Sequence, residues 1–240
     1  MRILITNDDS VSAAQLIPLI RWCQKIGDVT VVVPKYEQSG KSHGIELHKP
    51  FEGVQRELEP GLTVWTVDST PADCVRFAVF GLKQTFDLVI SGINRGYNMG
   101  SDMMYSGTVG AACEAGELGF KALAISTGIP SYAEAITHMD RVWDYICQNR
   151  LLELGDLYNI NIPSNPIGVR ITRQGGPYYS DDFIPLENGL WSPKGKRVHQ
   201  DRGDLNIESD AVTRGYISVM PLTTSKVHEA LYEKLISLNA

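Results

Sequence analysis

Short apolar runs alternate with segments of helical periodicity through the first two thirds of the chain. The apolar runs are short and rich in β-branched residues, as buried strands of a parallel sheet are. We predict strands over residues 2–6, 29–33, 62–67, 88–91 and 122–126. We predict helices over 13–26, from Thr70 to about Leu82, over 108–118 and within 133–149.

Strands that alternate with helices in this way predict a parallel sheet with right-handed crossovers. The expected fold is therefore α/β, a Rossmann-like three-layer sandwich with a mostly parallel sheet. The start of the second helix carries its own signal, because Thr70 is a good N-cap residue and Pro71 suits a first helical turn.

The pattern changes at about residue 169, where turn signals begin to separate short strand-like runs. We predict extended hairpins over about 169–209, with Asn188-Gly189 as a two-residue turn. A strand over 216–220 and an amphipathic helix over 226–238 are expected to return to the core. The chain thus divides into a core at 1–168 and a β-hairpin arm with returning elements at 169–240.

Aromatic side chains gather in the predicted hairpins, at Tyr178, Tyr179 and Trp191. Exposed aromatic residues on turn-rich strands are typical of an interface between subunits. The hairpin region is therefore expected to be an assembly arm and not a catalytic module.

The stretch from Asp87 to Glu117 carries the strongest candidate chemistry. Its buried strand stops at Ser91-Gly92, and a polar loop with further glycines and with Asn94 and Asn98 follows. Ser106-Gly107-Thr108 then opens a helix of small residues. A strand, a glycine-rich loop and a helix N-terminus together form an anion site at the carboxyl edge of a parallel sheet. The alternative is an ordinary surface loop, although loops of this length are uncommon in compact domains.

A second polar segment, Asn7-Asp8-Asp9-Ser10, follows the first predicted strand. Two adjacent carboxylates at that position suit a hard divalent cation, because magnesium, calcium and manganese prefer oxygen ligands. Helix capping is the alternative for Asp9. It leaves Asp8 unexplained, since two neighbouring negative charges repel each other unless a cation offsets them.

With these segments the chain resembles the SurE-type survival proteins, which are metal-dependent 5′- and 3′-nucleotidases with acid-phosphatase-like activity. The resemblance covers essentially the whole chain. The matching segments are 1–9, 39–40, 70–75, 91–112, 159–163 and 215–219, of which 91–112 is long and specific.

The resemblance implies one divalent metal ion per subunit, Mg²⁺ or Mn²⁺. The family's ligand positions correspond here to Asp8, Asp9, Ser39 and Asn94, and all four residue types are present. It also implies that the arm builds a homodimer or homotetramer. The substrates implied are nucleoside 5′- and 3′-monophosphates.

Two departures from the family pattern fall close to this site. The family usually has glycine after the aspartate pair, where this chain has Ser10. If the position needs a positive φ, serine adds strain of about 1 kcal/mol. The loop before Ser39 often carries arginines in the family and reads Lys35-Tyr36-Glu37-Gln38 here, which bears on substrate affinity.

The predicted reaction is hydrolysis of a phosphate monoester. The backbone amides near Gly107 and Thr108 and the hydroxyls of Ser106 and Thr108 are expected to hold phosphate oxygens, and Asn98 to orient the phosphate. Two routes stay open for the aspartates: Asp8 or Asp9 deprotonates the attacking water, or one of them attacks phosphorus. We favour direct water attack, because the haloacid-dehalogenase phosphatases that form an aspartyl-phosphate carry Asp-x-Asp and not adjacent acids.

His43 lies four residues past Ser39 in the same loop, where it is placed to protonate the leaving oxygen. A structural or solvated histidine is the alternative.

Composition narrows the partners. The net charge is −6 with no basic block, which argues against duplex nucleic acid. No apolar run approaches ~18 residues, so no membrane span is expected. Because the chain enters its first strand directly, we expect a cytoplasmic protein. Its four cysteines lack metal-ligand spacing and fall in predicted helices, so neither a disulfide framework nor a zinc site is expected.

Two functions of other classes compete with the phosphatase hypothesis. A non-catalytic nucleotide or phosphate sensor would keep the fold and bind without turnover, which the changed positions at Ser10 and Gln38 leave open. A dinucleotide oxidoreductase would share the sheet pattern. Its glycine fingerprint is replaced here by the acidic residues Asp8 and Asp9, which repel a pyrophosphate.

Overall fold

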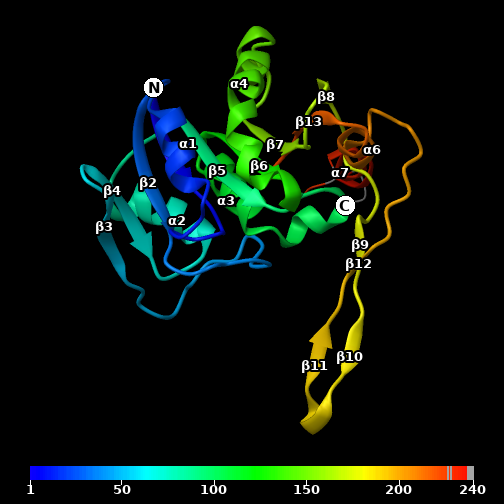
Figure 1. The fold of residues 1–240 in the computed structure, drawn as a ribbon, viewed down its shortest axis with the longest axis horizontal. Helices are drawn as coiled ribbons and strands as arrows, with labels where there is room; N and C mark the ends of the chain where they lie inside the picture. Colours follow the sequence, from blue (N-terminus) through cyan, green and yellow to red (C-terminus); the bar gives the residue numbers. More distant parts are fainter. Residues whose placement is uncertain (226, 228, 237–240) are drawn as a thin grey trace.

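The computed structural model describes residues 1–225, 227 and 229–236 of the 240-residue chain. A twisted sheet of nine strands forms the centre of this described part (Figure 1). In spatial order the strands are β3 (Gly53–Glu59), β4 (Leu62–Val67), β2 (Asp28–Pro34), β1 (Arg2–Thr6), β5 (Leu88–Arg95), β6 (Lys121–Thr127), β7 (Leu157–Ile162), β13 (Tyr216–Pro221) and β8 (Gly168–Ile171).

The strands from β4 to β7 pair in parallel, whereas β3 runs antiparallel to β4 and β13 runs antiparallel to β7. The α-helices are α1 (Leu16–Cys23), α2 (Pro71–Arg76), α3 (Gly107–Glu117), α4 (Met139–Gln148), α5 (Leu151–Leu154), α6 (Glu208–Thr213) and α7 (Glu229–Leu235). A π-helical turn, η1 (Phe77–Gly81), extends α2, and the 3₁₀ segments η2 (Gly100–Tyr105) and η3 (Ile129–His138) precede α3 and α4.

Both faces of the sheet are covered, as the continuous apolar strands require. In β1, Ile3 and Ile5 belong to the core shared with α1 and α4, whereas Leu4 belongs to the core shared with α2 and α3. Successive side chains of a strand point to opposite faces, so this division places one helical layer on each side. The predicted three-layer α/β sandwich is confirmed.

All five predicted strands are present, with ends that differ by up to four residues. The largest difference is in β5, which continues past Ser91 to Arg95. The helix predicted over 13–26 is shorter and begins at Leu16. The helix start at Thr70 is confirmed, because the Thr70 side chain accepts a hydrogen bond from the Asp73 amide.

The strand β7 was not among the predicted elements. Its sequence, Leu-Tyr-Asn-Ile-Asn-Ile, is fully buried although it contains Asn159 and Asn161. Two asparagine side chains interrupt the apolar run that marks a buried strand, and buried side-chain amides need hydrogen-bond partners that the sequence does not reveal. Those partners lie in the glycine-rich loop, as described below.

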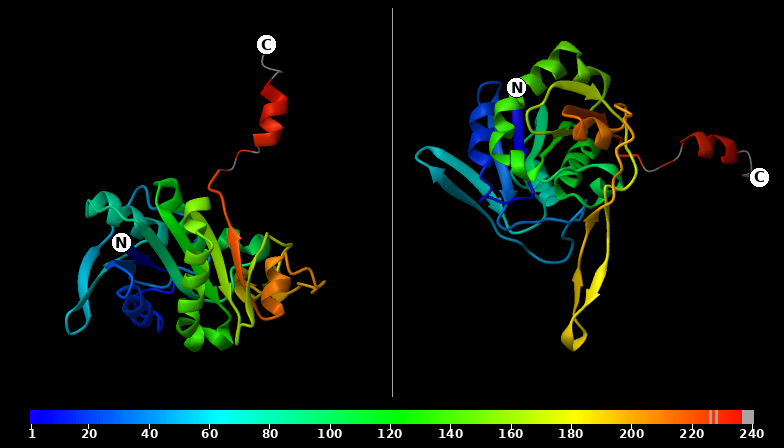
Figure 2. Two further views of the ribbon diagram at one scale, coloured as in Figure 1. Left: turned by 90° about the horizontal axis from the view of Figure 1, so that it is seen from above. Right: turned by 45° about the vertical axis from the view of Figure 1, so that its right-hand side comes forward.

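The arm projects from the body as two short antiparallel pairs, β9 (Tyr179–Ser180) with β12 (Lys196–Arg197) and β10 (Phe183–Pro185) with β11 (Trp191–Pro193) (Figures 1 and 2). The expectation that hairpins begin at about 169 and run to 209 is wrong at both ends. The sheet's edge strand β8 occupies residues 168–171, and the helix α6 begins at residue 208.

The turn at the tip of the arm has the predicted chemistry. Asn188 and Gly189 both have positive φ, 59° and 73°, as a two-residue hairpin turn requires. The Leu190 amide donates to the Glu187 carbonyl at 3.3 Å, which closes the turn. Because Pro185 pairs with Trp191, one extra residue forms a bulge beside the turn.

The aromatic residues of the arm differ in exposure. Tyr179 and Trp191 are exposed, as expected, but Tyr178 is buried at the base of the arm, which corrects the prediction for that residue. Its ring stacks on His199 with the centroids 5.4 Å apart, and its amide donates to Asp102 Oδ2. Tyr178 therefore anchors the arm to η2.

The strand predicted over 216–220 is confirmed as β13. The terminal helix predicted over 226–238 is present in its described part as α7. It lies away from the body, so the expectation that it returns to the core is wrong (Figure 2). Residues 226, 228 and 237–240 of that prediction lie outside the described residues. No helix in the described part of the chain has both the length and the apolar character needed to cross a membrane.

Candidate active site

The carboxyl ends of β1 and β5 bring the two polar segments together. These strands are adjacent and parallel, with Thr6 opposite Ser91. The chain runs from β1 to β2 on one side, and β5 lies on the other side, so this is a topological switch point of the sheet. The Arg95 amide donates to Asp9 Oδ2 at 2.9 Å, which joins the aspartate pair to the residue after Asn94.

The loop that carries Ser39 joins the same edge. The Gln38 amide donates to the Asp8 carbonyl at 2.8 Å. Ser39 itself is exposed, and its hydroxyl donates to Glu37 at 3.2 Å. The amides of Arg95 and Gln38 thus connect the segments of Asn94 and Ser39 to the aspartate pair. The four predicted metal ligands lie in these three segments.

The Asn94 side chain uses its amide nitrogen in a hydrogen bond to the backbone and keeps its amide oxygen available. Its Nδ2 donates to the Gly96 carbonyl at 2.8 Å, which leaves Oδ1 as an acceptor. The register of β5 on β6 shifts between Ser91 and Asn94. Gly92 is required within this irregularity, because its φ is 138° and a Cβ there would lie 2.3 Å from the Ile125 carbonyl oxygen.

Asp8 is buried beneath the N-terminus of α3. Its Oδ1 accepts a hydrogen bond from the Thr108 hydroxyl. A Cβ on Gly107 would lie 3.0 Å from Asp8 Cβ and 3.2 Å from Asp8 Oδ2, so the glycine lets the helix approach the carboxylate closely.

Both aspartates have raised pKa values. Burial raises the pKa of Asp8 from 3.8 to about 6, and the charge of Asp9 adds to the rise, while the Thr108 hydrogen bond opposes it. Burial also raises the pKa of Asp9, where the Arg95 amide opposes the effect and Glu37 adds to it. A cation bound beside the pair would stabilise the charged form of both carboxylates.

Ser10 occupies the position at which the family usually has glycine, and its φ is 70°. This left-handed conformation costs a non-glycine residue about 1 kcal/mol. Local hydrogen bonds support the turn: Ser10 Oγ accepts from the Ser12 amide, and the Ser10 carbonyl accepts from Asn7 Nδ2 and from the Ala13 amide. Serine is thus accommodated with the predicted strain.

The two hydroxyls that were expected to hold phosphate already have protein partners. Ser106 Oγ caps α3 by accepting from the Val109 amide at 3.2 Å. The Thr108 hydroxyl donates to Asp8. The amides of Gly107 and Thr108 lie in the first turn of α3, where helix geometry supplies no acceptor. A phosphate role for these residues therefore stays a prediction. The backbone amides are better candidates than the two hydroxyls, because the hydroxyls already have protein partners.

Asn98 is buried between the glycine-rich loop and β7. Its amide donates to Asn161 Oδ1 at 2.9 Å, and its carbonyl accepts from the side chains of Asn159 and Asn161 at 2.8 and 2.9 Å. Its Nδ2 donates to Ser126 Oγ at 2.8 Å. These bonds fix the loop, and they explain why β7 tolerates two buried amides.

Asn159 and Asn161 are therefore supporting residues that the sequence analysis did not identify. The signal for them was their spacing, because residues two apart in a strand share one face of the sheet.

His43 lies against the helix α3. The side chain is partly exposed, and its Nε2 lies 2.7 Å from Glu114 Oε2. The sequence analysis did not identify Glu114, which is buried in the middle of α3.

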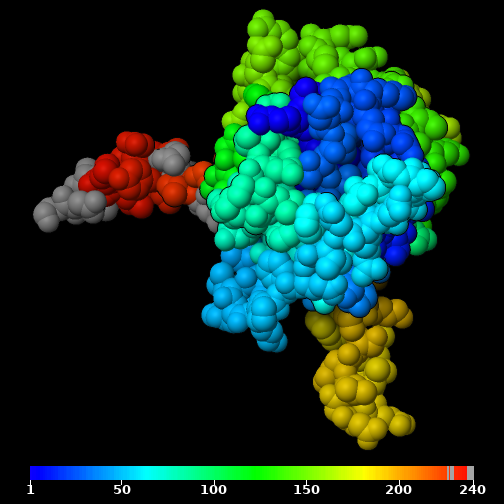
Figure 3. Space-filling model, turned by 90° about the vertical axis from the view of Figure 1, so that its left-hand side faces the viewer, coloured from blue at the N-terminus to red at the C-terminus, as the bar shows by residue number. Residues whose placement is uncertain are grey.

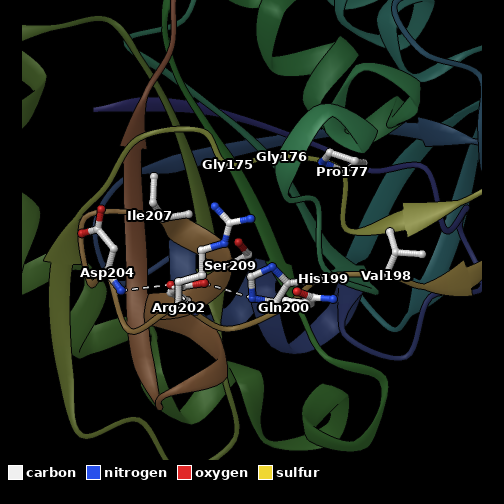
Figure 4. A pocket seen from close by; sticks show the side chains of 11 residues that line it. Gly175, Gly176, Pro177, Val198, His199, Gln200, Arg202, Asp204, Ile207 and Ser209 are labelled. Carbon is white, nitrogen blue, oxygen red and sulfur yellow. Dashed lines mark hydrogen bonds and ion pairs between the residues drawn. The ribbon is translucent and has the colours of Figure 1, made fainter.

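No group of three or more histidine, cysteine, aspartate or glutamate side chains that could hold a metal occurs among the described residues. The predicted site has two carboxylates, with a hydroxyl and an amide as its other donors, so it differs in kind from such clusters. A cavity of about 610 Å³ lies at the base of the arm. It is lined by residues 175–177 and by residues between 198 and 210, whose side chains are drawn in Figure 4. None of the predicted site residues lines it.

A cavity of about 390 Å³ lies beside the loop of Ser39 and is lined in part by Gln38, Lys41 and Lys49. This cavity is adjacent to the predicted metal ligands, because Gln38 is bonded to Asp8.

A family model described as "Survival protein SurE" matches residues 3–181 of the chain. The 5′-nucleotidase SurE of Alkaliphilus metalliredigens is 34% identical, over 100% of this chain and 99% of that protein. The 5′-nucleotidase SurE of Clostridium beijerinckii is 34% identical over 92% of each chain. The crystal structure of the SurE protein from Aquifex aeolicus has a TM-score of 0.79 and 27% identity, with both chains covered completely.

The family model spans most of this chain, the relatives match it over nearly its full length, and the solved structure shares its fold. The chain therefore belongs to the SurE survival protein family.

Proposed function

We propose that this protein is a metal-dependent phosphomonoesterase that hydrolyses nucleoside 5′- and 3′-monophosphates to nucleoside and phosphate. The meeting of the Asp8-Asp9, Ser39 and Asn94 segments beside the N-terminus of α3 is the observation that carries the proposal. It places candidate cation ligands next to a candidate anion site. The similarity to proteins named 5′-nucleotidase supports the substrate class.

The donor set fits a hard divalent ion. Asp8, Asp9, Ser39 and Asn94 offer oxygen atoms, which are the ligands that such an ion prefers. Burial raises the pKa of both aspartates, and a bound cation would favour their charged form. These four residues would hold one ion per subunit, Mg²⁺ or Mn²⁺. When bound, the ion supplies neutralisation of the charge that develops on the phosphate and lowers the pKa of a bound water.

The remaining steps belong to side chains and amides of the protein. The amides of Gly107 and Thr108 bind phosphate oxygens at the positive end of α3. Asn98 orients the phosphate indirectly, by fixing the glycine-rich loop, because both of its donors have protein partners. One of the two aspartates takes the proton of the attacking water. We favour this route over aspartyl-phosphate formation because the two acids are adjacent in sequence. His43 is proposed to protonate the leaving oxygen.

We predict that Asn94→Ala and Ser39→Ala weaken the apparent affinity for Mn²⁺ and that excess metal partly restores the rate. Each substitution removes one oxygen ligand from a set of four and leaves the aspartates in place. Phosphate release is measured across a Mn²⁺ titration, with Ser164→Ala as the control because Ser164 is exposed in the loop after β7. Loss of activity that follows the loss of thermal stability, with no rescue by metal, would assign both residues a purely structural role.

We predict faster hydrolysis of adenosine and guanosine monophosphates than of phosphodiesters under saturating Mn²⁺ or Mg²⁺. One metal site and one helix N-terminus match a terminal dianionic phosphate. A diester has one fewer charged oxygen and a second ester arm, which the loop between Gly92 and Gly107 crowds. A profile of substrates with a chelator control measures this, and faster cleavage of a diester would overturn the substrate class.

The same profile separates the phosphatase from its rivals. A nucleotide or phosphate sensor would bind monophosphates with no metal-stimulated release of phosphate. An oxidoreductase would bind a dinucleotide, which a cofactor titration detects.

We propose that the arm within the region 169–240 serves assembly and that the protein is a homodimer or homotetramer. The arm exposes large apolar side chains to solvent, Phe183, Leu186, Leu190 and Trp191 among them. Figure 3 shows the arm projecting on the same side of the body as the segment near residues 40–50. An isolated pair of strands is at best marginally stable in water. A partner surface would account both for the projection of the arm and for its exposed apolar side chains.

We predict that replacing Trp191 and Tyr179 together by polar residues reduces the solution mass. Both side chains are exposed on the arm, at 62% and 48%, and their removal takes apolar area out of the proposed interface. Light scattering coupled to gel filtration measures the mass of wild type and variant. A monomeric wild type, or an assembly unchanged in the variant, would contradict the proposal.

We propose a cytoplasmic location. The structure pairs none of the four cysteines in a disulfide, and cysteines outside disulfides are typical of reducing compartments. Neither duplex nucleic acid nor a membrane is proposed as a partner.

A further inference from the structure

The loop that carries His43 is seated on α3. A Cβ on Gly110 would lie 2.2 Å from the Ser42 carbonyl oxygen and 2.9 Å from His43 Cα. Only a glycine permits this approach of the loop backbone to the helix. η2 holds the loop from its other side, because the Ser42 amide donates to the Tyr105 carbonyl and the Ser42 hydroxyl to the Met104 carbonyl. The backbone of His43 is thus fixed.

Three positions on α3 that lie against Asp8 and the His43 loop share one face of the helix. Gly107 contacts Asp8, Gly110 contacts the backbone of His43, and Glu114 binds the His43 ring. These positions are spaced three and then four residues apart, which is the spacing of one helical face. Gly107 and Gly110 differ by three residues, or roughly 4.5 Å along the axis, so the His43 loop meets the helix within one turn of the aspartate.

Glu114 is buried, and each of its oxygens has a partner. Oε2 lies 2.7 Å from His43 Nε2, and Oε1 accepts from Arg76 at 3.1 Å. Burial raises the pKa of Glu114, but the His43 and Arg76 hydrogen bonds outweigh burial, so the pKa is lowered overall. The carboxylate therefore accepts a proton-bearing Nε2, and Nδ1 is the ring nitrogen left for exchange with a ligand.

We propose that Glu114 is a positioning residue for phosphate-ester cleavage, which holds the imidazolium of His43 through Nε2 so that Nδ1–H protonates the leaving oxygen. This inference rests on the proposed phosphatase function. In the step, the water oxygen forms a bond to phosphorus and the phosphorus–ester oxygen bond breaks. The proton moves from Nδ1 to the ester oxygen, His43 is left neutral with its Nε2–H still bound to Glu114, and solvent returns the proton.

A purely structural role is the competing explanation, because a buried carboxylate needs partners whatever it does. Arg76 already supplies one charged partner to Glu114, and Arg76 also lies 3.9 Å from Asp73. The His43 side chain is still 31% exposed, so it retains a path to a ligand. His43 and Arg76 are the charged groups that act on Glu114.

The test compares two substrates whose leaving groups differ in their need for a proton. The alkoxide that leaves AMP needs protonation, whereas nitrophenolate leaves 4-nitrophenyl phosphate without it. Under saturating Mn²⁺, we expect His43→Asn to lower kcat for AMP on the order of 100-fold, which is within the range of a positioned proton donor, and Glu114→Gln to lower it about tenfold. On 4-nitrophenyl phosphate, both variants should stay close to wild type.

Two further readouts and a control variant separate positioning from structure. The double variant should lose no more than His43→Asn alone, because both changes remove one function. The pH profile of kcat should change in Glu114→Gln, because a neutral amide replaces the carboxylate that lies against His43 Nε2. Glu117→Gln is the matched control, because Glu117 is an exposed glutamate on the same helix.

Equal losses on both substrates, additive effects and an unmoved pH profile would together overturn the inference. If Glu114→Gln does not fold, His43→Asn decides alone by the same comparison of substrates. A wild type that releases phosphate from neither substrate would overturn the proposed function, whereas an active wild type with equal losses overturns only this inference.

Discussion

Asp8→Asn and Asp9→Asn should each lower metal-dependent phosphate release by orders of magnitude while the chain still folds. Each change removes a negative charge and preserves the size of the side chain. If metal binding contributes several kcal/mol to stabilising the transition state, its loss lowers the rate roughly 100-fold to 1,000-fold. Asparagine at position 8 still accepts the hydrogen bond from Thr108, and asparagine at position 9 still accepts from the Arg95 amide.

Phosphate release from AMP under saturating Mn²⁺ measures this effect, and circular dichroism verifies the fold. Asp28→Asn is the matched control because Asp28 is an exposed aspartate at the start of β2. Full activity in either active-site variant, or in wild type after treatment with a chelator, would refute the assignment of the aspartates to the metal.

Without metal, Asp8→Asn should be more stable than wild type at neutral pH by about 3 kcal/mol. Burial raises the pKa of Asp8 from 3.8 to about 6, so the folded state binds the Asp8 proton more tightly than the unfolded state does. The stability from that proton is fully present below pH 3.8 and is lost as the pH rises to about 6. Above that range, the folded wild type retains a buried charge that the asparagine variant lacks.

Urea unfolding of both proteins with a chelator, at several pH values between 4 and 8, measures the difference in free energy of unfolding. Carboxylates that do not interact with Asp8 titrate equally in the two proteins, so the difference reports Asp8 together with its charged neighbour Asp9. Adding Mn²⁺ at neutral pH should stabilise wild type and leave the variant nearly unchanged. A variant that is less stable than wild type at pH 7.5 without metal would contradict the assigned cause.

Local signals in the sequence predicted much of the core correctly. The continuous apolar run 2–6 can be satisfied only by burial on both faces, and β1 is buried in that way. Thr70-Pro71 marked a helix start because cap chemistry involves neighbouring residues alone. Asn188-Gly189 likewise predicted a turn, since positive φ is a property of those two residues.

The sequence misled where the partner of a side chain is remote. Asn159 and Asn161 make the buried strand β7 look too polar for the core. Their partner is the Asn98 carbonyl, more than sixty residues earlier, which accepts from both side-chain amides. Tyr178 lies in a turn-rich segment typical of exposed aromatic residues. Only the tertiary structure shows that it is buried, with its ring stacked on His199 and its amide hydrogen-bonded to Asp102. Residues 168–171 resemble a hairpin strand until they pair with β13.

The sequence by itself determined the fold class and the chemical types of the candidate ligands, because apolar periodicity and oxygen-bearing side chains are properties of residues and their near neighbours. The tertiary structure decided which groups meet. It brought the Asp8, Ser39 and Asn94 segments to one sheet edge, gave the Thr108 hydroxyl to Asp8, and placed Glu114 against His43. Those contacts join residues up to a hundred positions apart, and they form only when strands pair and helices pack.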